Sequence, residues 1–270
     1  MYKIIALDLD GTLLSPKYEI TNYTEKIIKS LIEKNFYFIF ASGRHYIDIT
    51  SIQDKLKIKT FIISSNGARV YDLNRKLIFK KNLEIHIAQN LCKIKYFDNE
   101  IITQVYCDDN WYINNNEIDN KFCPSLSSLK YRFFKPNSLN YSNISKIFFT
   151  SCNINKMNIL EEEIIHLWGD NINASYSMPG CLEIVSGKTS KGEGLKKISS
   201  LLGVSLKNFI SFGDGMNDKE MLSISGKGCI MKNGDPRLKM ILPNIEIIES
   251  NVNDGVALFL YNTFLKNNSI

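Results

Sequence analysis

The segment Asp8-Leu9-Asp10-Gly11-Thr12 follows a short apolar run, Ile4–Leu7, near the start of the chain. An apolar run that ends in acids and glycine predicts a buried parallel strand leading into a functional loop. Because side chains alternate along a strand, we expect the two aspartates to point the same way and to meet one ligand. Gly11 allows close backbone approach, and the Thr12 hydroxyl can tie the turn. For this segment alone, a solvated acidic turn is the alternative.

A second acidic segment, Gly213-Asp214-Gly215-Met216-Asn217-Asp218, also follows an apolar strand and precedes a helix. Carboxylates gathered at the ends of adjacent strands are costly, because like charges and loss of hydration both oppose their ionisation. A divalent cation removes this cost. Oxygen ligands without a suitable histidine or cysteine favour Mg²⁺, which we therefore predict as the cofactor. A capped turn before a helix is the alternative for this segment alone.

Two further polar points lie where the same sheet edge is expected. Ser42-Gly43-Arg44 follows the predicted strand 36–41, so its hydroxyl and following amides suit a phosphate oxygen. Lys191 opens a predicted helix, where its ammonium can join the helix N-terminus in holding an anion. Taken alone, Ser42-Gly43-Arg44 is also typical of an ordinary turn, and Lys191 is also typical of an ordinary surface lysine. The agreement of four segments favours a shared site for phosphate and metal.

The order of predicted elements gives the fold class. Strands and helices alternate over residues 1–82 and 183–270, where we expect Asp254 to cap a closing helix that starts at Gly255. Between residues 83 and 182 the alternation is lost; strands at 101–107 and 111–114 predict a hairpin, and 86–94 and 157–168 predict helices. The prediction is an α/β fold: a Rossmann-like, doubly wound parallel sheet formed by residues 1–82 and 183–270, with an inserted α+β domain at 83–182.

Composition narrows the classes of partner. The 270 residues are 44% hydrophobic and carry a formal charge of +5 without a dense Lys/Arg tract, so we expect no nucleic-acid partner. No apolar run is long enough to cross a bilayer, and the first residues are too acidic for a signal peptide, so we expect no membrane partner. The six cysteines fall singly, at Cys92, Cys107, Cys123, Cys152, Cys181 and Cys229. We expect free thiols and a cytoplasmic location, as a monomer or a small homo-oligomer.

Together these segments resemble the haloacid dehalogenase (HAD) superfamily of phosphatases, and within it the Cof-type branch (type IIB, C2-capped), whose cap lies between the second and third motifs. The four motifs are Asp8–Leu14, Ala41–Arg44, Lys191-Gly192 and Gly213–Asp218. Three shorter segments also match, at Ser65–Ala68, Met231–Asn233 and Asp254–Ala257. The match covers nearly the whole chain, and the first and fourth motifs are the specific ones.

The resemblance implies a magnesium-dependent phosphatase acting on a small phosphorylated metabolite, with residues 83–182 as the cap that sets specificity. Asp8 would be the nucleophile, forming an aspartyl-phosphate, and a metal ligand. Asp10 would move the proton, while its backbone carbonyl completes the metal shell. Asp214 would bind the metal, with Asp218 either a direct ligand or a neighbour of one. The groups holding the phosphoryl oxygens would be Ser42, Lys191, Asn217 and the amides of Leu9 and Gly43.

Several alternatives stay open at the level of sequence. A phosphomutase would use the same aspartyl-phosphate and return the phosphoryl group to a sugar, and a phospho-ligand-binding module would keep the fold without the reaction. The substrate can be a sugar phosphate, a nucleotide or a cofactor phosphate, because the cap segment holds aromatics and asparagines without a readable code. Arg44 suits an anionic substrate or a surface or ion-paired role, and Asn66 suits the site or a turn. His45 suits a substrate contact, although a lone histidine usually has no such role. The aromatics near the hairpin suit a cap core or a substrate pocket.

Overall fold

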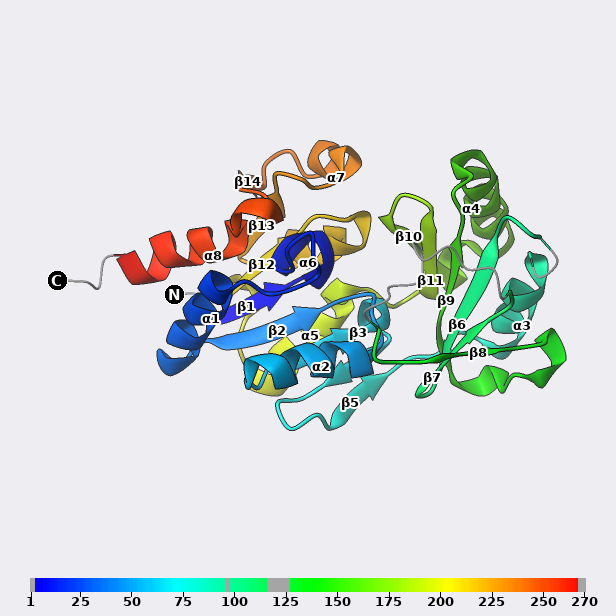
Figure 1. The fold of residues 1–270 in the computed structure, drawn as a ribbon, viewed down its shortest axis with the longest axis horizontal. Coiled ribbons are helices and arrows are strands. Elements are labelled where there is room, and N and C mark those ends of the chain that lie inside the picture. Colours follow the sequence, from blue (N-terminus) through cyan, green and yellow to red (C-terminus); the bar gives the residue numbers. More distant parts are fainter. Residues whose placement is uncertain (1–2, 96–97, 116–126, 267–270) are drawn as a thin grey trace.

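The computed structural model describes residues 3–95, 98–115 and 127–266. Its described strands form two sheets that lie side by side along the long axis of the molecule (Figure 1). The first sheet has the order β14 (Glu246–Ile248), β13 (Lys227–Met231), β12 (Phe209–Gly213), β1 (Ile4–Leu7), β2 (Tyr37–Ala41), β3 (Phe61–Ser64), β4 (Arg69–Tyr71), β5 (Leu77–Lys80). From β14 to β3 the strands are parallel, and β4 and β5 extend the sheet antiparallel.

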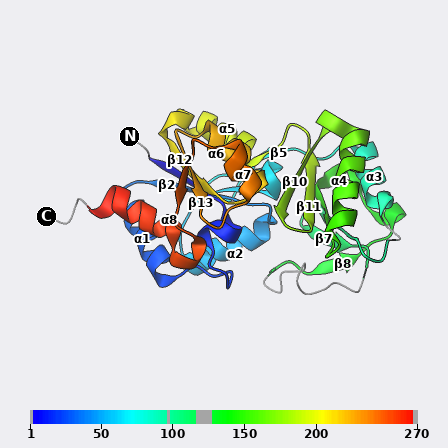
Figure 2. The same cartoon turned by 90° about the horizontal axis from the view of Figure 1, so that it is seen from above.

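Helices cover both faces of this sheet (Figure 2). On one face, apolar side chains of the strands pack against α1 (Asn22–Glu33), α2 (Tyr46–Leu56) and α8 (Gly255–Leu260). On the other face they pack against α5 (Lys191–Leu202) and α6 (Lys219–Ile224), while α7 (Pro236–Ile241) packs beside β13. The predicted doubly wound α/β core is confirmed. The antiparallel pair β4–β5 and the short helix α7 were not predicted.

Asp254 lies at the start of α8 as expected, but the prediction that its side chain caps this helix is wrong. Asp254 precedes α8, but its carboxylate makes no capping hydrogen bond, and its backbone is left-handed (φ 53°) rather than extended as is usual at an N-cap. The carboxylate instead accepts hydrogen bonds from the hydroxyls of Thr21 at 2.7 Å and Thr24 at 2.9 Å. Asp254 therefore ties the start of α8 to the start of α1.

The second sheet has the order β10 (Ile172–Met178), β11 (Cys181–Ser186), β9 (Ile144–Thr150), β6 (Ile102–Cys107), β7 (Asn110–Ile113), β8 (Tyr131–Phe133). β6 and β7 form the expected hairpin, with Cys107 opposite Asn110. Helices α3 (Ile85–Ile94) and α4 (Ile154–Trp168) pack on one face. The inserted segment was expected to end at residue 182, but β11 continues to Ser186.

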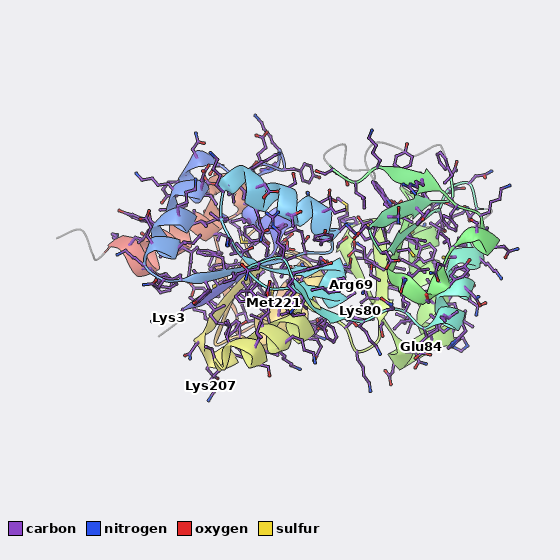
Figure 3. All side chains as sticks on the ribbon, turned by 90° about the horizontal axis from the view of Figure 1, so that it is seen from below. Lys3, Arg69, Lys80, Glu84, Lys207 and Met221 are labelled. Carbon is purple, nitrogen blue, oxygen red and sulfur yellow. The ribbon has the colours of Figure 1, made fainter. Side chains whose placement is uncertain are left out.

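The chain crosses between the sheets twice, after β5 and after β11. In Figure 3, Arg69 and Lys80 lie on the side of the first sheet nearest the second, and Glu84 lies beyond the first crossing. The buried Arg69 guanidinium holds that crossing by donating to the Lys81 carbonyl at 3.0 Å and to Asn82 Oδ1 at 2.6 Å.

Four of the cysteines are buried free thiols, namely Cys92, Cys107, Cys181 and Cys229. Burial raises the pKa of the Cys107 thiol to about 11 and those of the other three to about 12. Cys123 lies outside the described residues. Among the helices that the structure describes, none combines the length and the apolar character needed to cross a membrane.

Candidate active site

The predicted site segments meet at the carboxyl ends of neighbouring parallel strands. β12, β1 and β2 are adjacent, so Asp214, Asp8 and Ser42 follow three neighbouring strands. The Thr12 hydroxyl donates to Asp214 Oδ1 at 2.7 Å, which ties the first loop to the fourth. Gly11 has a φ of 79° and lies against the Asp214 carboxylate, so a side chain there would be strained and would collide with it.

Strand alternation does not place Asp8 and Asp10, because β1 ends at Leu7 and Leu9–Leu13 form a turn whose backbone is non-helical at Asp10 and Gly11. Asp8 is buried, whereas the side chain of Asp10 is 40% exposed. Both oxygens of Asp10 accept hydrogen bonds from the Arg44 guanidinium, at 2.6 and 2.7 Å. Of the two roles considered for Arg44, the structure shows the ion pair.

A cluster of three acids forms the centre of the site. One carboxylate oxygen each from Asp8, Asp214 and Asp218 lies within 4.8 Å of the others. The buried Lys191 ammonium donates to Asp8 at 2.5 Å and to Asp218 at 2.7 Å. Asp218 also accepts from the amides of Asp214 and Gly215, both at 3.0 Å. The Asp218 carboxylate thus belongs to the cluster, and that of Asp10 does not.

The electrostatics of the cluster oppose full ionisation. Burial raises the pKa of Asp8 well above its usual range; Lys191 counteracts this, and Asp218 and Asp214 add to it. Burial, followed by the charge of Asp218, raises the pKa of Asp214 to about 7. Burial alone would lower the pKa of Lys191, but the charges of Asp218 and Asp8 outweigh it and raise that pKa. A hard, all-oxygen donor set with surplus negative charge fits a divalent cation such as Mg²⁺.

The second motif supplies a hydroxyl beside this cluster. Ser42 is buried, and its Oγ accepts a hydrogen bond from the Arg44 amide at 3.1 Å. Because a hydroxyl has one hydrogen to donate, Ser42 can still donate it to a ligand. Asn217, in the fourth motif, donates to Asn66 Oδ1 at 3.2 Å. Asn66 therefore faces the site as well as forming the turn after β3, where its φ is 52°.

Sequence reasoning missed two charged residues on the second sheet. Lys146 on β9 and Glu183 on β11 are buried, and the Lys146 ammonium donates to Glu183 Oε1 and to the Gly43 carbonyl, both at 2.6 Å. The alternation in β9 sets Lys146 on the face opposite Ile147 and Phe149, which contact the helices. That pattern was visible in the sequence, but it does not show that the segments after β2 and β3, with Gly43 and Asn66, contact this face.

His45 has a structural role. Its Nδ1 accepts from the Ile47 amide at 3.3 Å at the start of α2, and its Nε2 donates to the Asp108 carbonyl of the β6–β7 turn at 2.9 Å. Burial lowers its pKa, although the Asp108 carbonyl opposes this. Of the hairpin aromatics, Tyr106 and Trp111 are buried in a small cluster, as expected for a cap core. Tyr131 and Phe133 on β8 are exposed, so they are not core residues.

Comparison with known proteins identifies the family. The sequence model of the haloacid dehalogenase-like hydrolases matches residues 5–260, and the chain belongs to this family. A Buchnera aphidicola (subsp. Schizaphis graminum) protein named "Putative phosphatase" is 63% identical over 268 residues, 99% of this chain and 98% of that protein. An "HMP-PP phosphatase" of Yersinia pestis (strain Pestoides F) is 30% identical over 261 residues, 97% of this chain and 95% of that protein.

A solved structure shares the fold over almost the whole chain. It is a HAD subclass IIB sugar phosphatase with a TM-score of 0.82 and 19% identity, and the match covers 96% of this chain and 98% of the other. The predicted family and the predicted enzyme class, a phosphatase, are confirmed.

Proposed function

We propose that this phosphatase hydrolyses a small phosphorylated metabolite by nucleophilic attack of Asp8, with Mg²⁺ as its metal. The observation that carries the proposal is the buried cluster of Asp8, Asp214 and Asp218 around Lys191 at the carboxyl edge of the sheet. The metal would be held by Asp8, Asp214 and the backbone carbonyl of Asp10, with Asp218 fixing Lys191. When bound, Mg²⁺ would neutralise charge on the cluster and on the phosphate.

In the first step, Asp8 forms a bond to phosphorus while the bond from phosphorus to the leaving oxygen breaks, giving an aspartyl-phosphate. Asp10 donates a proton to that oxygen. In the second step, Asp10 takes a proton from a water molecule that attacks phosphorus, which releases phosphate and restores Asp8. The ion pair with Arg44 supports the second step, because its two hydrogen bonds hold the ionised Asp10 carboxylate, the form that takes a proton from water, in one orientation.

The phosphoryl oxygens would be held by donors around Asp8. We assign this role to Ser42, Lys191 and Asn217 and to the amides of Leu9 and Gly43. Burial of Lys191 beside Asp8 and the available Ser42 hydrogen support the assignment. Phosphoryl transfer depends mainly on such positioning and on neutralisation of charge.

We propose that residues 83–182, together with the rest of β11, form a cap over the site. A cavity of about 180 Å³ lies beside Asn66 and Asn217 and is also lined by Tyr176 of β10. Among the described residues, the buried Tyr176 hydroxyl has no hydrogen-bond partner. A cavity of about 150 Å³ holds one benzene ring. The volume is large enough for the ring of a single-ring sugar or cofactor phosphate.

The test is to assay the purified protein with p-nitrophenyl phosphate and a panel of sugar, cofactor and nucleoside phosphates, with and without Mg²⁺. Metal-dependent phosphate release is expected; no release from any compound would reject the proposal. Asp8→Asn should keep the fold and lose turnover, and retained turnover would reject Asp8 as nucleophile. Incorporation of ¹⁸O from labelled water into the released phosphate separates hydrolysis from phosphomutase chemistry.

A further inference from the structure

A charged pair on the second sheet reaches the phosphate loop of the first. Lys146 is 2% exposed, and its ammonium lies between Glu183 Oε1 and the Gly43 carbonyl, at 2.6 Å from each. The rings of Tyr106 and Phe148 enclose it, with centroids at 4.9 and 4.4 Å. The Lys146 ammonium is thus directed at the segment proposed to hold phosphate.

Stability is a weak explanation for this pair. Burying two charges costs hydration that their attraction offsets only with good geometry, and apolar replacements of buried pairs are often neutral or stabilising. The apolar face of the same sheet, formed by Ile147, Phe149 and their neighbours, already packs against α3 and α4. The contacts that Lys146 and Glu183 make with Gly43 and Asn66 point to a role in the site.

The first of these contacts acts on Ser42. The Gly43 carbonyl, which accepts from Lys146, belongs to the same peptide unit as the Arg44 amide, which donates to Ser42 Oγ at 3.1 Å. A charged donor on the carbonyl fixes the plane of this unit and strengthens the hydrogen bond from its amide. With its oxygen held as an acceptor, the Ser42 hydroxyl has its hydrogen left to donate.

The second contact acts on Asn217. Glu183 Oε2 accepts from Asn66 Nδ2 at 2.5 Å, and Asn66 Oδ1 accepts from Asn217 Nδ2 at 3.2 Å. The close approach of Glu183 depends on Gly43, because a Cβ atom there would lie 2.5 Å from Glu183 Oε2. The pair therefore orients one proposed phosphate donor through a peptide unit and another through an amide side chain.

We propose that Lys146 and Glu183 are positioning residues for phosphoryl transfer, with Lys146 orienting Ser42 and Glu183 orienting Asn217. The inference rests on the proposed function, because it assumes that these two side chains hold the phosphoryl group. Lys146 does not reach the substrate, since it is buried and enclosed. Its loss therefore acts on the phosphate end alone and lowers turnover by the same factor for every leaving group.

The experiment is a double-mutant cycle of Lys146→Met and Ser42→Ala. Lys146→Met should lower kcat/KM by roughly 10- to 100-fold, the range for losing a charge-assisted hydrogen bond. In the Ser42→Ala background the same change should cost less than about threefold, because Ser42 is the group through which it acts. An equal factor in both backgrounds, or a factor that varies with the leaving group, overturns the proposal. Lys95→Met is the matched control, because it breaks the partly exposed Lys95–Glu163 pair between the end of α3 and α4, the helices that pack on the opposite face of the second sheet.

Lys146→Met leaves Glu183 buried without its cation, so it could unfold the protein. The double variant Lys146→Met/Glu183→Met removes both charges and should fold as well as the wild type while keeping the loss in kcat/KM. Wild-type kcat/KM in that folded variant overturns the proposal.

Binding of inorganic phosphate in the presence of Mg²⁺, measured by calorimetry, separates this inference from the proposed function. If the wild type binds phosphate but hydrolyses no substrate, the proposed function fails. The inference then stands if Lys146→Met weakens phosphate binding and Lys95→Met does not. It is overturned if Lys146→Met binds phosphate like the wild type, or if the wild type binds none.

Discussion

Without metal, the acidic cluster should make the protein less stable as the pH rises. Burial and Asp218 raise the pKa of Asp214 from 3.8 to about 7. An acid with a raised folded-state pKa stabilises the folded state fully below the unfolded pKa, and this stability is lost as the pH rises through the folded value. At about 1.4 kcal/mol per pKa unit, the full loss is about 4 kcal/mol, and more than half of it falls between pH 5 and 8.

Metal binding should reverse this trend. The carboxylates must lose their protons to bind a cation, so Mg²⁺ stabilises the folded state more at pH 8 than at pH 5. Asp8, whose pKa burial also raises, acts in the same direction as Asp214. In chelator, by contrast, the stability lost at Asp214 lowers the melting temperature. At about 2–4 °C per kcal/mol for a chain of this size, we expect a fall of about 5–10 °C between pH 5 and 8.

Scanning calorimetry at pH 5, 6, 7 and 8, in chelator and in Mg²⁺, measures both effects. Asp214→Asn cannot titrate and should lose that part of the pH dependence. Asp54→Asn, at an exposed aspartate on α2, is the control and should keep the wild-type slope. If Asp214→Asn has the same slope as the wild type in chelator, or if Mg²⁺ raises the melting temperature equally at pH 5 and pH 8, the electrostatic account of the cluster is wrong.

Three further changes test single contacts. Arg44→Met should lower kcat by roughly 10- to 100-fold because Asp10 loses both hydrogen bonds, and Arg44→Lys should restore little since a lysine cannot make the paired contact; full activity of either variant contradicts this. Gly43→Ala places a Cβ atom 2.5 Å from Glu183 Oε2 and should lower kcat/KM for all substrates alike. An unchanged kcat/KM would show that the loop accommodates the methyl group without loss of activity. Asp254→Ala removes two hydroxyl contacts and should lower the free energy of unfolding in urea by about 1–3 kcal/mol, with kcat unchanged; a loss below about 0.5 kcal/mol contradicts the role given to Asp254.

The parts of the fold that the sequence predicts are those with a strong local signal. Strands such as Ile4–Leu7 and Phe61–Ser64 are short apolar runs bounded by polar turn residues, and α1 has its apolar stripe and its Thr21 cap. The antiparallel pair β4–β5 lacked such a signal, because β4 has only three residues and begins with Arg69, and Leu77–Lys80 lies partly exposed at the sheet edge. The local sequence pattern does not show which segment pairs with the edge strand of a sheet.

At the site, the sequence indicates which segments meet but not which side chains pair. The proposed roles of Asp8, Asp214 and Lys191 rest on motifs at strand ends, and the structure brings these three together. The pairing of Asp10 with Arg44, and of Lys146 with Glu183, joins residues 34 and 37 positions apart. Each pairing depends on how two loops or two strands are placed in space, and a single sequence does not contain that placement.

Because of the charge at the site, we expect Lys191 to be insufficient for the proposed reaction without a cation. Within the described acidic cluster, three carboxylates face one buried ammonium, so the ionised cluster repels a phosphate ester that is itself an anion. Protonating Asp214 lowers that charge but removes a proposed metal ligand, and protonating Asp8 removes the proposed nucleophile. A divalent cation lowers the charge while Asp8 stays ionised, so it should improve substrate binding as well as turnover. Omitting Mg²⁺ should therefore raise the dissociation constant of inorganic phosphate, and an unchanged constant would limit the metal to the chemical step.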